Sequence, residues 1–150
     1  MLFRIVIAVI AVASATTVVI AQSDPIEARR TEMKAMGSHI YGALNRMQRG
    51  QEPYDQAKVD AAFVQFAASL QKLPTLFPQG SVSGTKPGEN FRTSDKIWTE
   101  KAAFDGRFAK LAKDAADTKP KVTNLDALKA AYPTIRQTCD SCHETYLIKN

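Results

Sequence analysis

Apolar residues recur at intervals of three and four in four stretches of the chain, whereas no stretch alternates with the period of two typical of a β-strand. The stretches cover, approximately, residues 25–49, 55–72, 94–116 and 124–148. In the first, the apolar side chains fall within roughly 100° of one helical face; they are Ile26, Met33, Met36, Ile40, Ala43, Leu44 and Met47. Four amphipathic helices joined by three connections predict an all-α fold, an antiparallel four-helix bundle.

Proline, glycine and capping residues mark the ends of these helices. Gly50 ends the first stretch and Pro74 ends the second, because proline has no amide hydrogen to donate. Residues 74–93 are rich in proline and glycine and predict a long irregular connection, a kind of loop that is often functional. Ser94 is the expected N-cap of the third helix, and Pro133 is expected to kink the fourth.

The first 21 residues have the pattern of a secretory signal peptide. Arg4 supplies a short basic region, residues 5–13 are continuously apolar, and small residues lead to a cleavage site near Ala21. The alternative is an uncleaved membrane anchor, because residues 5–21 approach the lower length limit of a spanning helix. We favour cleavage, which predicts a signal peptide at 1–21, a mature domain at 22–150, a periplasmic location and no stable membrane insertion after cleavage.

Composition limits the class of protein. A length of 150 residues corresponds to about one domain, and a hydrophobic content of 45% is ordinary for a globular fold. The formal charge is +5, from 20 basic and 15 acidic side chains, and it is too small and too scattered to predict nucleic-acid binding. Only two cysteines occur, which excludes a disulfide-framework miniprotein.

The fourth helix carries the sequence Cys139-Asp140-Ser141-Cys142-His143. The pattern Cys-x-x-Cys-His is the attachment signature of c-type haem. Two thiols three residues apart lie on one side of a helical turn, where both can form thioethers with the vinyl groups of one porphyrin. His143 follows at once and can bring its imidazole to the iron. The motif therefore predicts one covalent haem c, bound by Cys139 and Cys142, with His143 as the proximal ligand.

Three other interpretations of the cysteines are weaker. A Cys-x-x-Cys redox pair is expected at a helix N-terminus after a strand, whereas this pair lies near the end of a helix. A zinc site needs about four ligands, and His39 is the only further histidine. A simple disulfide in a haem-free exported helical protein leaves His143 without a role.

The sixth iron position decides between functions. Met33 and Met36 lie on the inward face of the first helix, and a thioether is a good axial ligand for an electron carrier. Met33 is the first choice, because Gly37 one turn later leaves room for a ring, and Met36 is the second. Methionine on an apolar stripe is more often core filler. His39 lies to the side of the apolar face, so ligation by two histidines is a minor alternative.

Several residues are candidates for contacts with the rest of the haem. Arg29 and Arg30 can reach its propionates, although a solvated first helical turn would explain them as well. Phe91, Trp98 and Tyr132 are candidates for packing on the porphyrin, and ordinary core packing explains them equally well.

Over essentially the whole mature region, the chain resembles the class II cytochromes c, which have the haem motif near the C-terminus of a four-helix bundle. The resemblance is carried by Arg29, Met33, Lys34 and Gly37, the turn at 50–55, and segments 53–62, 73–78, 97–98 and 128–131. These segments are most similar to the low-spin cytochrome c-556 branch. In that branch, the methionine matching Met33 binds iron opposite the histidine. In the cytochrome c′ branch, the iron has no sixth ligand even where this position is methionine.

The resemblance implies an exported electron-transfer protein that is not an enzyme and that docks with redox partner proteins. A homodimer is common in the family, although no exposed apolar stripe in this sequence demands one. The alternative is a five-coordinate, high-spin cytochrome c′ that binds nitric oxide or carbon monoxide. The chain departs from many members at Leu147, where they carry Arg or Lys four residues after the haem histidine.

Overall fold

The computed structural model describes residues 24–150, so the predicted signal peptide lies outside the described part of the chain. The first helical rod consists of α1 (Pro25–Gly37), the π-helical segment η1 (Ser38–Leu44) and α2 (Asn45–Gln48). The side chain of Asp24 caps α1 by accepting a hydrogen bond from the Ile26 amide at 2.9 Å. The predicted first helix is therefore confirmed, with a π-helical interruption that the apolar pattern did not predict.

The other rods match the predicted stretches closely, and the side chains of Asp55 and Asn124 cap α3 and α6 by accepting backbone amides. The remaining elements are α3 (Gln56–Lys72), η2 (Leu73–Leu76), β1 (Phe91–Thr93), α4 (Lys96–Thr99), α5 (Lys101–Thr118), η3 (Lys119–Lys121), α6 (Leu125–Tyr146) and β2 (Leu147–Lys149). The α6 helix continues through Pro133.

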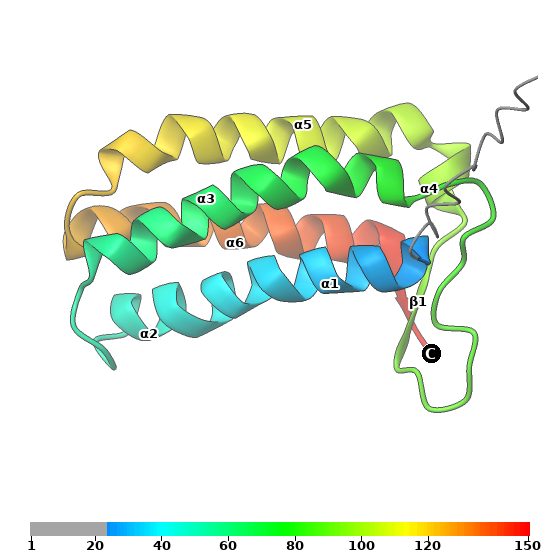
Figure 1. Cartoon of the computed structure of the whole chain (residues 1–150), viewed down its shortest axis with the longest axis horizontal. Coiled ribbons are helices and arrows are strands. Elements are labelled where there is room, and N and C mark those ends of the chain that lie inside the picture. The colour runs from blue at the N-terminus through cyan, green and yellow to red at the C-terminus, as the bar shows by residue number, and fades with distance from the viewer. Residues whose placement is uncertain (1–23) are drawn as a thin grey trace, which may run out of the picture.

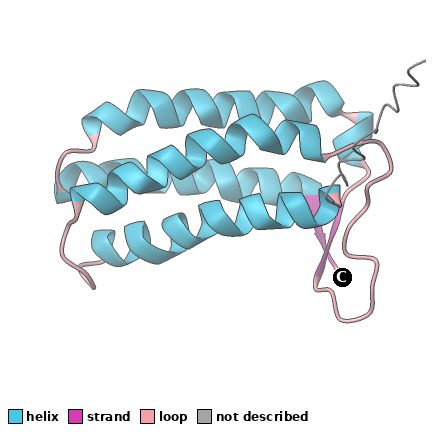
Figure 2. Ribbon diagram, in the orientation of Figure 1, coloured by secondary structure: helices cyan, strands magenta, loops and turns pink. Residues whose placement is uncertain are grey.

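The four rods form the expected antiparallel bundle (Figures 1 and 2). The α2–α3 and α5–α6 turns lie at one end, and the long loop before β1 lies at the other end together with the C-terminus (Figure 1). Apolar side chains from all four rods fill the centre; the most buried large ones are Leu44, Met47, Leu73, Ile97, Leu128, Val59 and Val122. Within residues 24–150, no helix combines the length and the apolar character that crossing a membrane requires.

Two local expectations are wrong. The third helix is not continuous from Ser94, because the backbone breaks at Glu100 between α4 and α5. The fourth helix ends at Tyr146 instead of 148, because Leu147–Lys149 pairs with Phe91–Thr93 in a two-stranded antiparallel sheet. Strands of three residues are too short to show an alternating pattern, so the hydrophobic periodicity carries no signal for them.

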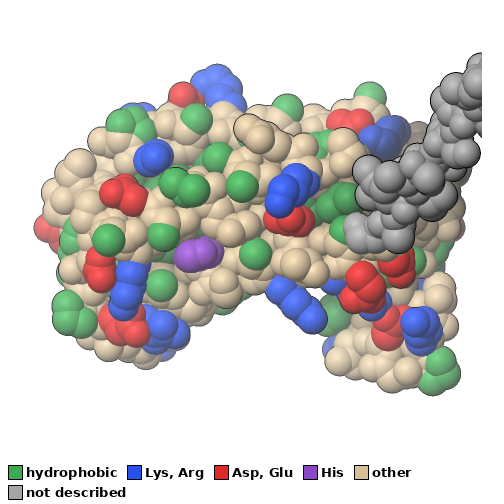
Figure 3. All heavy atoms as spheres, in the orientation of Figure 1, with side chains coloured by type: hydrophobic (Ala, Val, Ile, Leu, Met, Phe, Trp, Pro, Cys, Tyr) green, Lys and Arg blue, Asp and Glu red, His purple; other side chains and the backbone are tan. Residues whose placement is uncertain are grey.

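Charged side chains of both signs are interspersed on the face shown in Figure 3. On α5, three lysines form ion pairs with the aspartate four residues later; the pairs are Lys101–Asp105, Lys110–Asp114 and Lys113–Asp117. Such pairs stabilise an exposed helix by about 0.2–0.5 kcal/mol each. In each pair the negative charge of the aspartate offsets the positive charge of the lysine, so these lysines of α5 do not form a basic patch.

Candidate functional site: a cavity between α1, α5 and α6

Two adjoining cavities lie between α1, α5 and α6, at the end of the bundle that carries the long loop. Their volumes are about 280 Å³ and about 70 Å³, and they share Met33, Phe108, Cys142 and His143 in their walls. These four residues form a shared wall, so the two cavities are neighbours in the space between the helices. Together they reach the lower part of the size range typical of small-molecule and cofactor sites.

Both cysteines of the Cys-x-x-Cys-His motif open onto this space. Cys139 and Cys142 line the smaller cavity, and they are free thiols. Burial raises the pKa of Cys139 to about 11, and burial also raises the pKa of Cys142. A dithiol redox centre instead needs a thiol whose pKa is lowered. These buried thiols therefore do not fit the oxidoreductase alternative, whereas two thiols facing one cavity fit attachment to a single bound group.

His143 lies next to the thiols and lines both cavities. Burial by the surrounding protein lowers the pKa of His143, with Asp140 opposing the shift. The neutral imidazole, which is the form that binds a metal, is therefore favoured at neutral pH. Within residues 24–150, no group of three or more His, Cys, Asp or Glu side chains could hold a metal ion. The zinc alternative therefore has no donor set in this region.

The methionines of α1 also lie in the cavity walls. Met33 lines both cavities, whereas Met36 and Gly37 line only the smaller one. Met33 is therefore the methionine that shares all of the space that His143 faces. His39 lines neither cavity, so the structure does not bring the two histidines to one site.

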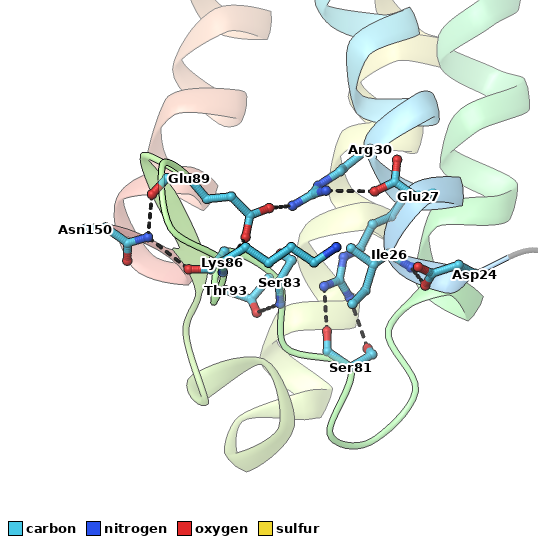
Figure 4. A network of polar contacts seen from close by, with 12 residues as sticks. Asp24, Ile26, Glu27, Arg30, Ser81, Ser83, Lys86, Glu89, Thr93 and Asn150 are labelled. Atoms are coloured by element: carbon cyan, nitrogen blue, oxygen red, sulfur yellow. Dashed lines mark hydrogen bonds and ion pairs between the residues drawn. The ribbon is translucent and has the colours of Figure 1, made fainter.

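Arg29 and Arg30 both line the larger cavity, but their guanidinium groups already have partners. Arg29 is 3% exposed, lies 4.8 Å above the Phe77 ring, and donates to the Ser81 hydroxyl at 3.0 Å. Arg30 pairs with Glu27 at 2.7 Å and with Glu89 of the long loop (Figure 4). The two arginines therefore attach the loop to α1, and any contact with a bound anion would use their remaining donors.

Further hydrogen bonds fold the long loop over this end of the bundle (Figure 4). The Asn150 side-chain amide donates to the carbonyls of Gly84 and Glu89 at 2.9 and 2.7 Å. Gly84 adopts a positive φ of 82°, and a Cβ there would lie 1.9 Å from the Phe91 carbonyl oxygen. Only glycine allows this close approach, so the loop is built to lie tightly against β1 beside the larger cavity.

Sequence reasoning missed several polar residues of the cavity walls, Tyr41 and Arg107 among them. Tyr41 and Arg107 both line the smaller cavity. Tyr41 lies outside the apolar stripe of the first helix, and Arg107 lies beside the stripe of α5, so hydrophobic periodicity could not select them. Among the aromatic candidates, Phe91 lines the larger cavity, whereas the indole of Trp98 donates to the Pro78 carbonyl at 3.0 Å.

Comparisons with known proteins show the family and the fold of the chain. Residues 24–147 match the family described as Cytochrome C′. The chain is 39% identical over 146 residues to a cytochrome c-556 of Rhodopseudomonas palustris, with 97% of both chains covered. It is also 35% identical to a cytochrome c′ of the same species, covering 87% of this chain and 86% of that one. The solved structure of cytochrome c′ from Rhodopseudomonas palustris superposes with a TM-score of 0.75 at 33% identity, covering 86% of this chain and 99% of the other.

Proposed function

The chain belongs to the cytochrome c′ family and carries one covalent haem c, and on this basis we propose that it is an electron-transfer protein with His143 and Met33 as axial ligands. Cys139 and Cys142 hold the haem through thioethers in this proposal. When bound, haem c supplies an iron that accepts one electron and gives it up again.

The observation that carries the proposal is that Met33 and His143 line the same two adjoining cavities from different helices. Met33 belongs to α1 and His143 to α6, so the two side chains reach the cavities from different helices. With both positions filled by protein side chains, oxidation and reduction require little rearrangement around the iron.

Apolar side chains form much of the wall of the larger cavity. Phe104, Phe108 and Ile97 line the larger cavity and are at most 5% exposed. An apolar surround of this kind lowers the local dielectric and so favours the less charged ferrous state. Phe91 lies at the edge of the same cavity and is 51% exposed, which provides an apolar contact for a docking redox partner. Redox encounters use small interfaces, so no large exposed apolar patch is required.

Export and location are part of the same proposal. The alignment with the bacterial cytochrome c-556 covers 146 of the 150 residues, so it includes most of residues 1–21. This supports a signal peptide that both proteins share, cleavage near Ala21, a mature domain at 22–150 and a periplasmic location. A homodimer and the absence of enzymatic activity remain predictions from the family resemblance.

A second candidate is a five-coordinate protein that binds nitric oxide or carbon monoxide. It is favoured by the 35% identity to a cytochrome c′ and by the apolar walls of the cavity, which would accept a small neutral ligand. In this alternative, Met33 lines the site without binding the iron.

The Met33→Ala variant separates the two candidates. In a six-coordinate carrier, the variant opens the iron, so reduced protein binds carbon monoxide at once while the wild type does not. The Met36→Ala variant is the matched control and leaves the wild-type behaviour unchanged. Immediate and complete carbon monoxide binding by the wild type would contradict Met33 ligation and favour the second candidate.

A further inference from the structure

The first helical rod and α6 pack against each other through η1 and α2, whereas the two cavities lie where α1 faces α6. The two rods are therefore in contact along one half and separated by the site along the other. The segment η1 lies at the boundary between these halves, directly after the part of α1 that carries Met33. Contacts between η1 and α6 can therefore control the distance between α1 and α6 at the cavities.

One such contact starts from Tyr41 in η1. Its hydroxyl donates to the Asp140 carboxylate at 3.0 Å, and Asp140 lies between the two cysteines of the motif. Arg136 donates to the other oxygen of the same carboxylate at 3.2 Å and stands 5.7 Å from the centre of the Tyr41 ring. The tyrosine is thus held by a hydrogen bond to a charged group and by a cation–π contact, and both partners belong to α6.

In a second contact, the donor belongs to α6 and the acceptor to η1. The hydroxyl of Tyr132, in α6, donates to the Ile40 carbonyl at 3.2 Å, and both residues are buried. Ile40 lies within the π-helical segment, next to Tyr41. A π-helical turn is rare and is often found at functional sites. Here, hydrogen bonds on two adjacent residues attach that turn to the helix that carries the haem motif.

We propose that Tyr41 is a positioning residue that ties the helix of Met33 to the turn of Cys139 and Cys142, and so holds Met33 at the distance that His143 requires. This inference rests on the proposed function, because it needs Met33 to be an iron ligand. Tyr41 lines the smaller cavity beside Gly37 and Cys139 and is 45% exposed, so its hydrogen bond lies at the solvent edge of the site. Loss of the hydrogen bond lets α1 move away from α6, and Met33 then leaves the iron more often.

Tyr54 supplies a matched control. Its hydroxyl shares its hydrogen between the Gln56 side-chain oxygen at 2.6 Å and the Val122 carbonyl at 3.1 Å, and the second contact joins the α2–α3 and α5–α6 connections at the far end of the bundle. Tyr54→Phe and Tyr41→Phe each remove one phenolic hydroxyl and one cross-bundle hydrogen bond while keeping the ring. Only Tyr41 lies at the cavity, so a difference between the two variants reports on position rather than on general stability.

The experiment measures carbon monoxide binding to the reduced holoprotein by stopped flow at saturating gas. Under this condition the rate reports how often Met33 leaves its position. We expect Tyr41→Phe to bind about three to ten times faster than the wild type, the range for losing one partly exposed hydrogen bond to a carboxylate. Arg136→Gln removes the second contact on the same carboxylate and is expected to shift the rate in the same direction by less. Tyr54→Phe is expected to match the wild type.

Equal rates for wild type, Tyr41→Phe and Arg136→Gln would overturn the inference while leaving Met33 ligation intact. Immediate binding by the wild type would overturn the proposed function, and the positioning role with it. If Tyr41→Phe fails to acquire haem, the Arg136→Gln variant tests the inference instead. The side chain of Arg136 is 50% exposed, so this substitution is expected to leave folding and haem attachment intact. A wild-type rate for Arg136→Gln would then contradict the positioning role.

Discussion

The two halves of the bundle contrast in how they are filled. At the end that contains α2 and the start of α6, Leu44, Met47, Val59 and Leu128 are at most 1% exposed, and side chains fill the centre. At the other end, the walls formed by α1, α5 and α6 leave two adjoining cavities. The first half is filled by buried side chains, as expected of a protein core, whereas the second leaves space that we propose the haem fills. The stability of the fold and the site for its cofactor are thus placed in different parts of one bundle.

A cluster of packed aromatic rings nevertheless forms one side of the open half. Phe77, Phe108 and Tyr146 surround Phe104, with ring centres 4.8, 5.1 and 4.9 Å from it in edge-to-face geometry. Such pairs add about 0.5–1.5 kcal/mol each beyond the area that they bury. These rings border the larger cavity. In the proposed site, a preformed wall of this kind would give the haem a fixed surface to pack against, and residues of the loop and of α1 also line the cavity.

The largest expected effect comes from removing the attachment in the open half. The double variant Cys139→Ser and Cys142→Ser is expected to lose all covalent haem, because hydroxyl groups do not form the thioethers. Haem staining after denaturing electrophoresis measures this directly. His39→Ala is the control and is expected to keep full staining, because His39 lines neither cavity. Haem retained through denaturation by the double variant would contradict the assignment.

Next in size is a pair of leucine truncations, one in each half. Leu128 is 1% exposed in the filled half, so Leu128→Ala is expected to lower the free energy of unfolding by about 2–5 kcal/mol. Leu111 lines the smaller cavity, so Leu111→Ala enlarges a space that already exists. It is therefore expected to lower the free energy of unfolding less than Leu128→Ala does, and to alter the haem spectrum more. Urea unfolding and visible spectra of both holoproteins measure the two effects. If both variants lost the same free energy of unfolding and had the same haem spectrum, the proposed contrast between the two halves would be wrong.

The smallest effect is expected from the loop that covers the open half. The amide of Lys86 and the guanidinium of Arg30 hold the pKa of Glu89 below its ordinary value of 4.5. The ionised carboxylate therefore stabilises the fold above that pH, and the contribution is lost as the pH falls through the lowered pKa. Glu89→Gln is expected to melt slightly below the wild type at pH 7, and the difference is expected to disappear on acidification. A difference that persists at low pH would show that the charge is not the cause.

Much of this arrangement could be predicted from the sequence. The four rods follow from apolar spacing, the turns from proline and glycine, and the haem from Cys139, Cys142 and His143. The comparisons confirm the bundle and the cofactor. The position of Met33 on the inward face of the first helix predicts a place at the site, and Met33 lines both cavities, as His143 does. The predictions of the bundle and the haem succeed because each depends on residues that are close together in the sequence, whereas ligation by Met33 stays a prediction.

The rest depends on contacts between distant segments. The pairing of β1 with β2 joins residues more than fifty positions apart and was not predicted. The π-helical turn shifts the register of the first rod at Ser38, so a constant angle per residue misplaces Tyr41. The partners of Arg29 and Arg30 lie in the long loop, whose path no local pattern specifies. Roles that rest on such contacts require the folded molecule.

The most direct test of the central claim is the visible and near-infrared spectrum of the wild-type holoprotein, oxidised and then reduced, before and after carbon monoxide. Ligation by His143 and Met33 predicts a low-spin spectrum, with a weak methionine sulfur-to-iron band in the oxidised form. It also predicts that the reduced spectrum is unchanged immediately after the gas is added. A high-spin spectrum that shifts at once and completely with carbon monoxide would contradict the account and identify a gas-binding protein.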